Sequence, residues 1–216
     1  MANRCEAVDI PDTQGASLID GVINRAKIKA HKEEFFKAEA EKGSLRPDWS
    51  TEFKRFTSDK RNYQDAVIVL SVGPYNAIPA VRLGLPEDEW ITLSDRIRKY
   101  HECTHFVCRR LFPEKKNAVW DELVADVVGI YAAFGKYNPR VEELFLGIED
   151  GRYVGGRLEN YVTDLSGEER AAVLSELADK ISSVLKDFDK VISENSSAAP
   201  FELALLLEDS MKELWG

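Results

Sequence analysis

The sequence is organised around one stretch, TLSDRIRKYHECTHFVCRRLF, at positions 92–112. Apolar residues and one threonine, Thr104, recur in it at alternating steps of four and three, at positions 93, 97, 100, 104, 107 and 111. This spacing predicts an amphipathic α-helix from about residue 93 to residue 112. Thr92, followed three residues later by Asp95, resembles a capping box at the start of the helix, and Pro113 is expected to end it.

Residues 101–105 of this helix read HECTH, which is an HExxH motif. Side chains four residues apart lie on one face of a helix, so His101 and His105 can reach a single metal ion. Glu102 points about 100° around the same helix, toward a metal-bound water. Both histidines follow a residue of the apolar stripe by one position. They therefore border the core, where ligands that face a cleft are expected.

The next helix, predicted over residues 118–134, carries a pair of carboxylates one turn apart, Glu122 and Asp126. If residues 113–116 join two antiparallel helices, Glu122 comes back beside His105. Two histidines and one glutamate with a fourth position open is the arrangement of a catalytic zinc site. Asp126 is then expected to accept the second N–H of a ligating histidine, which fixes the orientation of its ring.

The two helices together resemble a known group of enzymes. An HExxH helix followed by a helix with a glutamate and, four residues later, an aspartate is the pattern of gluzincin-type zincin metallopeptidases, the thermolysin-like group. The stretch Asp121-Glu122-x-x-x-Asp126 is similar to the Asn-Glu-x-x-x-Asp helix of that group. The resemblance covers about residues 66–134.

This resemblance implies a chemistry in which a zinc-activated water attacks a peptide amide. By position it assigns the zinc ligands His101, His105 and Glu122, the general base Glu102 and the orienting carboxylate Asp126. It also implies that the strand before the metal-binding helix lies along the cleft and pairs with extended substrate, with residues 67–72 as the counterpart.

The segment GRYVGGRLENY, at positions 151–161, is expected to stabilise the oxyanion of the reaction. A third histidine, His31, falls in the N-terminal part of the chain, so an arginine or a tyrosine must take this role. The glycines permit a close backbone approach, and Arg157 and Tyr161 lie one turn apart if the segment is helical. The alternative is that both side chains are structural, as Arg and Tyr near a surface usually are.

The composition describes an acidic chain of 216 residues, with 29 Lys and Arg against 38 Asp and Glu and a net charge of -9. Acidic residues spread along the chain disfavour binding to nucleic acid. No apolar run approaches the roughly 18 to 20 residues of a membrane span, and the first residues lack the apolar stretch of a signal peptide. Cys5, Cys103 and Cys108 show no CxxC spacing. We therefore expect a cytoplasmic protein that binds neither nucleic acid nor membrane.

The other expected elements are mostly helical. They are a helix over 17–42, a loop over 45–60, a buried strand over 65–72, a weaker strand over 78–83, a helix after the capping pair Ser166 and Glu169, and a last helix that runs to Trp215.

These features predict a mainly helical α+β protein with a zincin-like fold: a small sheet, an HExxH helix and a following Glu-bearing helix. We expect a single domain, with an N-terminal helical extension (1–44), a metal-binding core (45–140) and a C-terminal helical layer (141–216). The predicted function is a zinc metallopeptidase-like hydrolase that acts on a peptide or protein. Two alternatives remain open: a non-catalytic helical binding or regulatory protein with a structural or vestigial metal site or none, and a metal-dependent hydrolase of a non-peptide amide.

Overall fold

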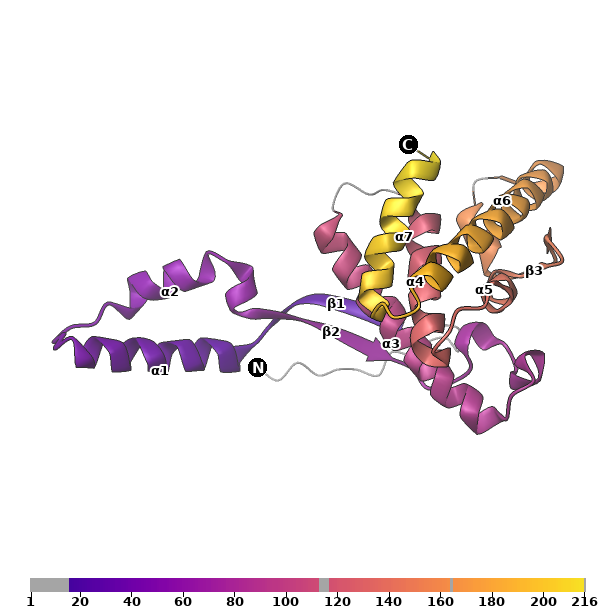
Figure 1. Ribbon diagram of the computed structural model, residues 1–216. Coiled ribbons are helices and arrows are strands. Elements are labelled where there is room, and N and C mark those ends of the chain that lie inside the picture. Colours follow the sequence, from indigo (N-terminus) through magenta and orange to yellow (C-terminus); the bar gives the residue numbers. More distant parts are fainter. Residues whose placement is uncertain (1–15, 113–116, 164, 216) are drawn as a thin grey trace. The chain divides into compact units, whose positions relative to one another are not determined.

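The computed structural model describes residues 16–112, 117–163 and 165–215 (Figure 1). Within them the chain is mainly helical, with two small two-stranded sheets, so the expected mainly helical α+β class is confirmed. The expected connection over 113–116 and the first cysteine, Cys5, lie outside the described residues. None of the helices in the described part of the chain combines the length and the hydrophobicity that crossing a membrane requires.

The chain divides into two compact units, where the sequence had suggested a single domain with a core beginning at residue 45. The first, called here the hairpin unit, is Leu18–Val69, and the second, the helical unit, includes Leu70–Gly216. The boundaries differ because the two strands of the hairpin unit, at its beginning and its end, pair with each other. The chain between them is thereby closed into a unit of its own.

The hairpin unit has two strands and two main helices. Its elements are β1 (Ala16–Ile23), α1 (Arg25–Glu41), α2 (Trp49–Thr57), the 3-10 helix η1 (Lys60–Asn62) and β2 (Gln64–Leu70). The aromatic ring of Trp49 in α2 lies against those of Phe35 and Phe36 in α1, at centroid distances of 5.7 and 6.2 Å. The expected strand over 65–72 is confirmed as β2.

Two expectations for the hairpin unit are wrong. The expected helix over 17–42 begins only at Arg25, because the preceding residues form β1, and the side chain of Asn24 caps α1 by accepting from two backbone N–H groups. The expected loop over 45–60 contains α2, whose first turn is capped by the Asp48 carboxylate accepting from the Thr51 N–H at 3.1 Å. The aromatic residues of this stretch have no regular spacing, so the sequence pattern did not predict this helix.

The helical unit contains the two helices with the predicted ligands. Its elements are the 3-10 helices η2 (Tyr75–Ala77) and η3 (Ala80–Leu83), the helices α3 (Glu87–Leu111), α4 (Ala118–Phe134) and α5 (Pro139–Leu146), the short strands β3 (Ile148–Glu149) and β4 (Arg152–Tyr153), the 3-10 helix η4 (Arg157–Tyr161), and the helices α6 (Gly167–Glu194) and α7 (Pro200–Trp215). Strands β3 and β4 pair antiparallel, with Ile148 opposite Tyr153.

The predicted helices of this unit are confirmed as α3, α4, α6 and α7, but two details were wrong. Helix α3 begins at Glu87, so Thr92 lies inside it and donates its hydroxyl to the Asp88 carbonyl instead of capping the helix. Ser166 makes no side-chain hydrogen bond at the start of α6. The weaker strand expected over 78–83 is instead the 3-10 helix η3, which runs between Pro79 and Gly84.

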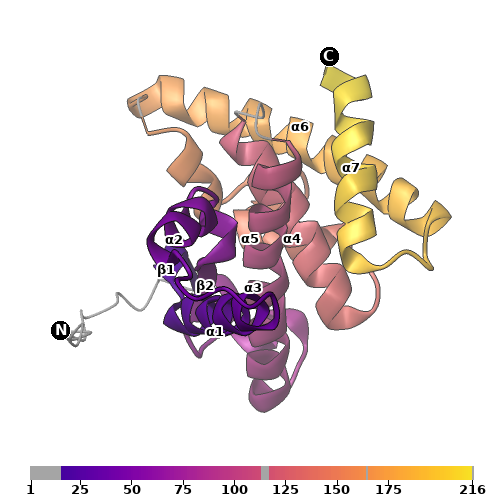
Figure 2. The ribbon, with the colours of Figure 1, turned by 90° about the vertical axis from the view of Figure 1, so that its left-hand side faces the viewer.

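Helix α4 lies at the centre of the helical unit and contacts α3, α5 and α7 (Figure 2). Nine of its residues are buried. Helix α3 approaches it closely at Gly129, where an added Cβ would lie 2.9 Å from the backbone oxygen of Ile97. The small residue therefore lets the two helices come together at the level of the predicted ligands.

Candidate metal centre

Helices α3 and α4 bring the three predicted ligands together. The Nε2 atoms of His101 and His105 lie 3.0 Å apart, and they lie 3.4 and 3.3 Å from the two carboxylate oxygens of Glu122. A tetrahedral zinc site with bonds of about 2.0–2.1 Å holds its ligand atoms about 3.3 Å apart. The three groups thus already have the separations that one zinc ion requires, and among the described residues they form a group able to hold a metal ion.

The Asp126 carboxylate lies behind the first histidine and is fully buried. Its Oδ1 accepts a hydrogen bond from Nδ1 of His101 at 2.8 Å. Because Nδ1 donates to Asp126, Nε2 is the ring nitrogen that faces His105 and Glu122 and that can bind a metal ion once it has lost its proton. The structure therefore places Asp126 where the sequence expected an orienting carboxylate.

Tyr75, which the sequence pattern did not indicate, is buried beside Asp126. Its hydroxyl donates to Oδ1 of Asp126 at 2.6 Å and lies 3.1 Å from Nδ1 of His101. The two residues that follow, Asn76 and Ala77, adopt positive φ angles of 50° and 56°, which are unusual for residues other than glycine. Only the Gly73-Pro74 turn before Tyr75 could have drawn attention to this segment.

Arg157 reaches the same buried carboxylate from the other side. Its Nη2 forms an ion pair with Oδ2 of Asp126, and its Nη1 lies 3.9 Å from Oε2 of Glu122. The segment reaches the site through a close crossing of two glycines: a Cβ on Gly147 would meet the Gly155 oxygen at 2.3 Å. Glycine at position 147 is thus required for this crossing, and Arg157 contacts both acids of α4.

Tyr161 lies at the end of η4 and also faces this group. The pKa of Tyr161 is raised, mainly by burial. The charge of Arg157 lowers this pKa, whereas the charge of Glu122 and a hydrogen bond to Glu122 raise it. Both residues selected from the 151–161 segment therefore lie near Glu122. Their expected role in stabilising an oxyanion stays a prediction.

The pKa values reflect the close packing of these charges. Burial lowers the pKa of His101, but its hydrogen bonds to Asp126 and Glu122 outweigh burial and raise the pKa to about 9. Burial raises the pKa of Glu122, yet its contacts with His101 and His105 hold it well below the usual range. Burial also raises the pKa of Asp126, but the charge of Arg157 and the contacts with His101 outweigh burial and lower it. The shifts thus favour the ionised form of both carboxylates, which is the form that binds or orients metal ligands.

An open cavity of about 260 Å³ lies against the three groups. It is lined by His101, His105 and Glu122, and also by Glu102, which the sequence selected as the general base. A water or a substrate carbonyl placed at this group therefore has Glu102 in the same cavity. Cys103 is half-buried outside this lining.

Comparison with known proteins shows the family of the chain without showing its activity. Over residues 1–214 the sequence matches the model of a family of unknown function, DUF7005, and the chain belongs to that family. No curated protein and no solved structure matches it.

Proposed function

We propose that this protein is a zinc-dependent hydrolase of the metallopeptidase type, in which His101, His105 and Glu122 bind the metal. The observation that carries the proposal is the set of separations of 3.0, 3.4 and 3.3 Å among their ligand atoms. Two of the ligands lie in α3 and one in α4, as in the gluzincin pattern. We propose on the same ground that α3 and α4 are the counterparts of the two metal helices of a zincin-like fold.

Three protein ligands beside an open cavity favour catalysis over a purely structural site. Structural zinc sites are closed by four protein ligands, whereas catalytic sites keep the fourth position for water or substrate. The described group supplies three, and the cavity of about 260 Å³ gives access to it. A bound zinc ion supplies a Lewis acid that activates water and polarises a carbonyl.

Other residues of the chain have the remaining roles in the proposed reaction. Glu102 accepts the proton of the attacking water and passes it to the nitrogen of the leaving amine, as its place in the cavity permits. Asp126 holds His101 in the tautomer that offers Nε2 to the metal. Tyr75 and Arg157 in turn donate to Asp126 and keep this buried carboxylate ionised.

The substrate of the proposed reaction is a peptide or protein amide, and the proposed compartment is the cytoplasm. Among the described residues Cys103 is a free thiol, which suits a reducing compartment.

The experiment is metal analysis followed by two matched variants in α3. We expect one zinc per chain in the wild type, its loss in His105→Ala, and its retention in Glu102→Gln together with loss of peptide hydrolysis. The control is Glu89→Gln, at an exposed position of the same helix, which should keep both zinc and activity. Hydrolysis that survives Glu102→Gln contradicts the mechanism. Stoichiometric zinc without hydrolysis of any peptide, together with a large loss of thermal stability on chelation, identifies a structural site instead.

A further inference from the structure

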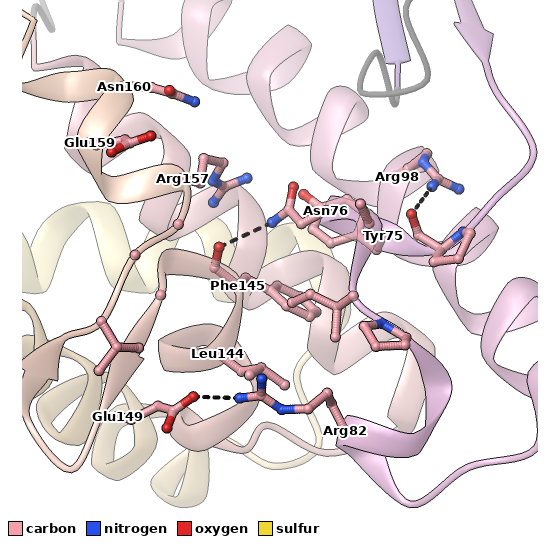
Figure 3. A pocket seen from close by; sticks show the side chains of 18 residues that line it. Tyr75, Asn76, Arg82, Arg98, Leu144, Phe145, Glu149, Arg157, Glu159 and Asn160 are labelled. Atoms are coloured by element: carbon pink, nitrogen blue, oxygen red, sulfur yellow. Dashed lines mark hydrogen bonds and ion pairs between the residues drawn. The ribbon is translucent and has the colours of Figure 1, made fainter.

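A second, larger cavity of about 690 Å³ adjoins the metal cavity (Figure 3). The two share four lining residues: Tyr75, Asn76, Arg98 and Arg157. A molecule bound at the candidate metal group therefore has the larger cavity beside it, and the lining of this cavity bears on which substrates fit.

Arg98 differs from the other arginines of this lining. In Figure 3 a dashed line joins the Arg82 guanidinium to Glu149. Arg157 forms its ion pair with Asp126. Arg98 forms no ion pair with any residue that the structure describes. Its Nη2 donates to the carbonyl oxygens of Gly73 and Pro74 at 2.6 and 2.8 Å.

The rest of the Arg98 guanidinium has donors without acceptors. Its side chain is buried, with the residue 3% exposed, and within the described chain its Nε and Nη1 have no hydrogen-bond partner. A buried polar group left unpaired costs about 1–3 kcal/mol, and more when it is charged. The acceptor that suits a buried guanidinium best is a carboxylate, because the hydrogen bonds are then charge-assisted.

The position of Arg98 along α3 sets its distance from the reaction. It precedes His101 by three residues and His105 by seven, so all three lie on one face of the helix. Three residues correspond to a rise of about 4.5 Å, and one extended peptide residue spans about 3.3–3.6 Å. A group held by Arg98 is therefore about one residue away from a group held at the metal site.

We propose that the larger cavity binds the substrate residue next to the scissile amide and that Arg98 holds the free α-carboxylate of this residue. The protein then releases a terminal amino acid from peptides or from N-acyl amino acids. Ile78, Leu144 and Phe145 also line the cavity, so an apolar side chain on the released residue fits it. This inference rests on the proposed hydrolase function, which it extends to a substrate class.

Direct binding to metal-free protein tests the proposal without turnover. N-acetyl-L-leucine, which has the carboxylate, should bind at least tenfold more tightly than N-acetyl-L-leucinamide in calorimetry. Arg98→Met should remove this preference, and Arg96→Met, at an exposed position of the same helix, should keep it. The comparison of acid with amide on the wild type needs no variant and remains decisive if Arg98→Met does not fold. A third ligand, N-acetyl-L-aspartic acid α-amide, offers only a side-chain carboxylate, and tighter binding of this ligand than of N-acetyl-L-leucine overturns the assignment to the α-carboxylate.

Turnover separates this inference from the proposed function. Peptides with a free C-terminus should be cleaved at least tenfold faster, in kcat/KM, than the same peptides with a C-terminal amide. Equal rates that depend on zinc and Glu102 overturn the role of Arg98 and leave the hydrolase intact. If no peptide is cleaved while the zinc-loaded protein still prefers the acid in binding and loses this preference in Arg98→Met, the hydrolase fails and the carboxylate site stands.

Discussion

Nδ1 of His101 donates to the Asp126 carboxylate at 2.8 Å, while Nε2 of the same ring lies 3.4 Å from Glu122. The imidazole of His101 thus lies between the fully buried carboxylate of Asp126 and the half-buried carboxylate of Glu122, which is one turn away on α4. This relationship fixes which nitrogen is available to a metal, and it makes Asp126 the residue through which the surrounding structure controls the site.

Replacing Asp126 by Asn should weaken zinc binding by about 10–100-fold, because the amide cannot hold His101 and Arg157 as the carboxylate does. Competition with a chromophoric chelator measures the affinity. Asp187→Asn, at an exposed position of α6, is the control and should bind zinc as the wild type does. Equal affinity of Asp126→Asn and wild type contradicts the orienting role.

Gly129→Ala should lower the free energy of unfolding by about 1–3 kcal/mol, because the new methyl group meets the Ile97 backbone oxygen at 2.9 Å. At an exposed helical position the same change stabilises a protein by about 1 kcal/mol. Urea denaturation therefore distinguishes the two cases by sign. We also expect weaker zinc binding, since the helices that hold the proposed ligands are pushed apart. If Gly129→Ala is more stable than the wild type, the close contact with Ile97 is absent.

Glu142→Gln should change how stability depends on pH. Glu142 is fully buried, accepts a hydrogen bond from the Tyr137 hydroxyl at 2.7 Å, and faces the charges of Asp126 and Arg157. Burial, followed by the charge of Asp126, raises its pKa well above 4.5. A carboxyl group whose pKa is raised on folding contributes stability that is complete below its unfolded pKa and is lost as pH rises.

The wild type should therefore lose stability relative to Glu142→Gln between pH 5 and pH 8, as measured by the midpoint of chemical denaturation at each pH. Glu168→Gln, at an exposed position in the first turn of α6, is the control and should follow the wild type. A difference between Glu142→Gln and wild type that is constant over this range means that Glu142 is ionised in the folded protein.

Trp49→Ala should destabilise the hairpin unit and leave zinc binding unchanged. Trp49 contacts four aromatic rings, those of His31, Phe35, Phe36 and Phe53. Each such ring pair contributes about 0.5–1.5 kcal/mol beyond the area that it buries. Hydrogen exchange should become faster in α1 and α2, and Leu45→Ala, at a position 96% exposed in the same unit, should not change it. Loss of zinc binding in Trp49→Ala contradicts this prediction.

Much of the helical unit could be predicted because its signals are local. The apolar period of α3, the Asn117 cap and the Gly135 stop of α4 follow from backbone geometry within a few residues. The hairpin unit was predicted less well for the opposite reason. Residues 17–23 have helix-compatible apolar spacing, and only their pairing with β2, more than 40 residues later, makes them a strand.

The sequence by itself determined the candidate ligand set, since the spacing of His101 and His105 on one helix and of Glu122 and Asp126 on the next is a property of helix periodicity. The tertiary structure alone decided which side chains surround that set. Tyr75 and Arg98 carry no motif. Tyr75 reaches the site because a turn after β2 packs against α3, and the same turn accepts hydrogen bonds from Arg98 in α3. Spacing along a helix is fixed by local backbone geometry, whereas contacts between distant segments depend on how the whole unit folds and packs.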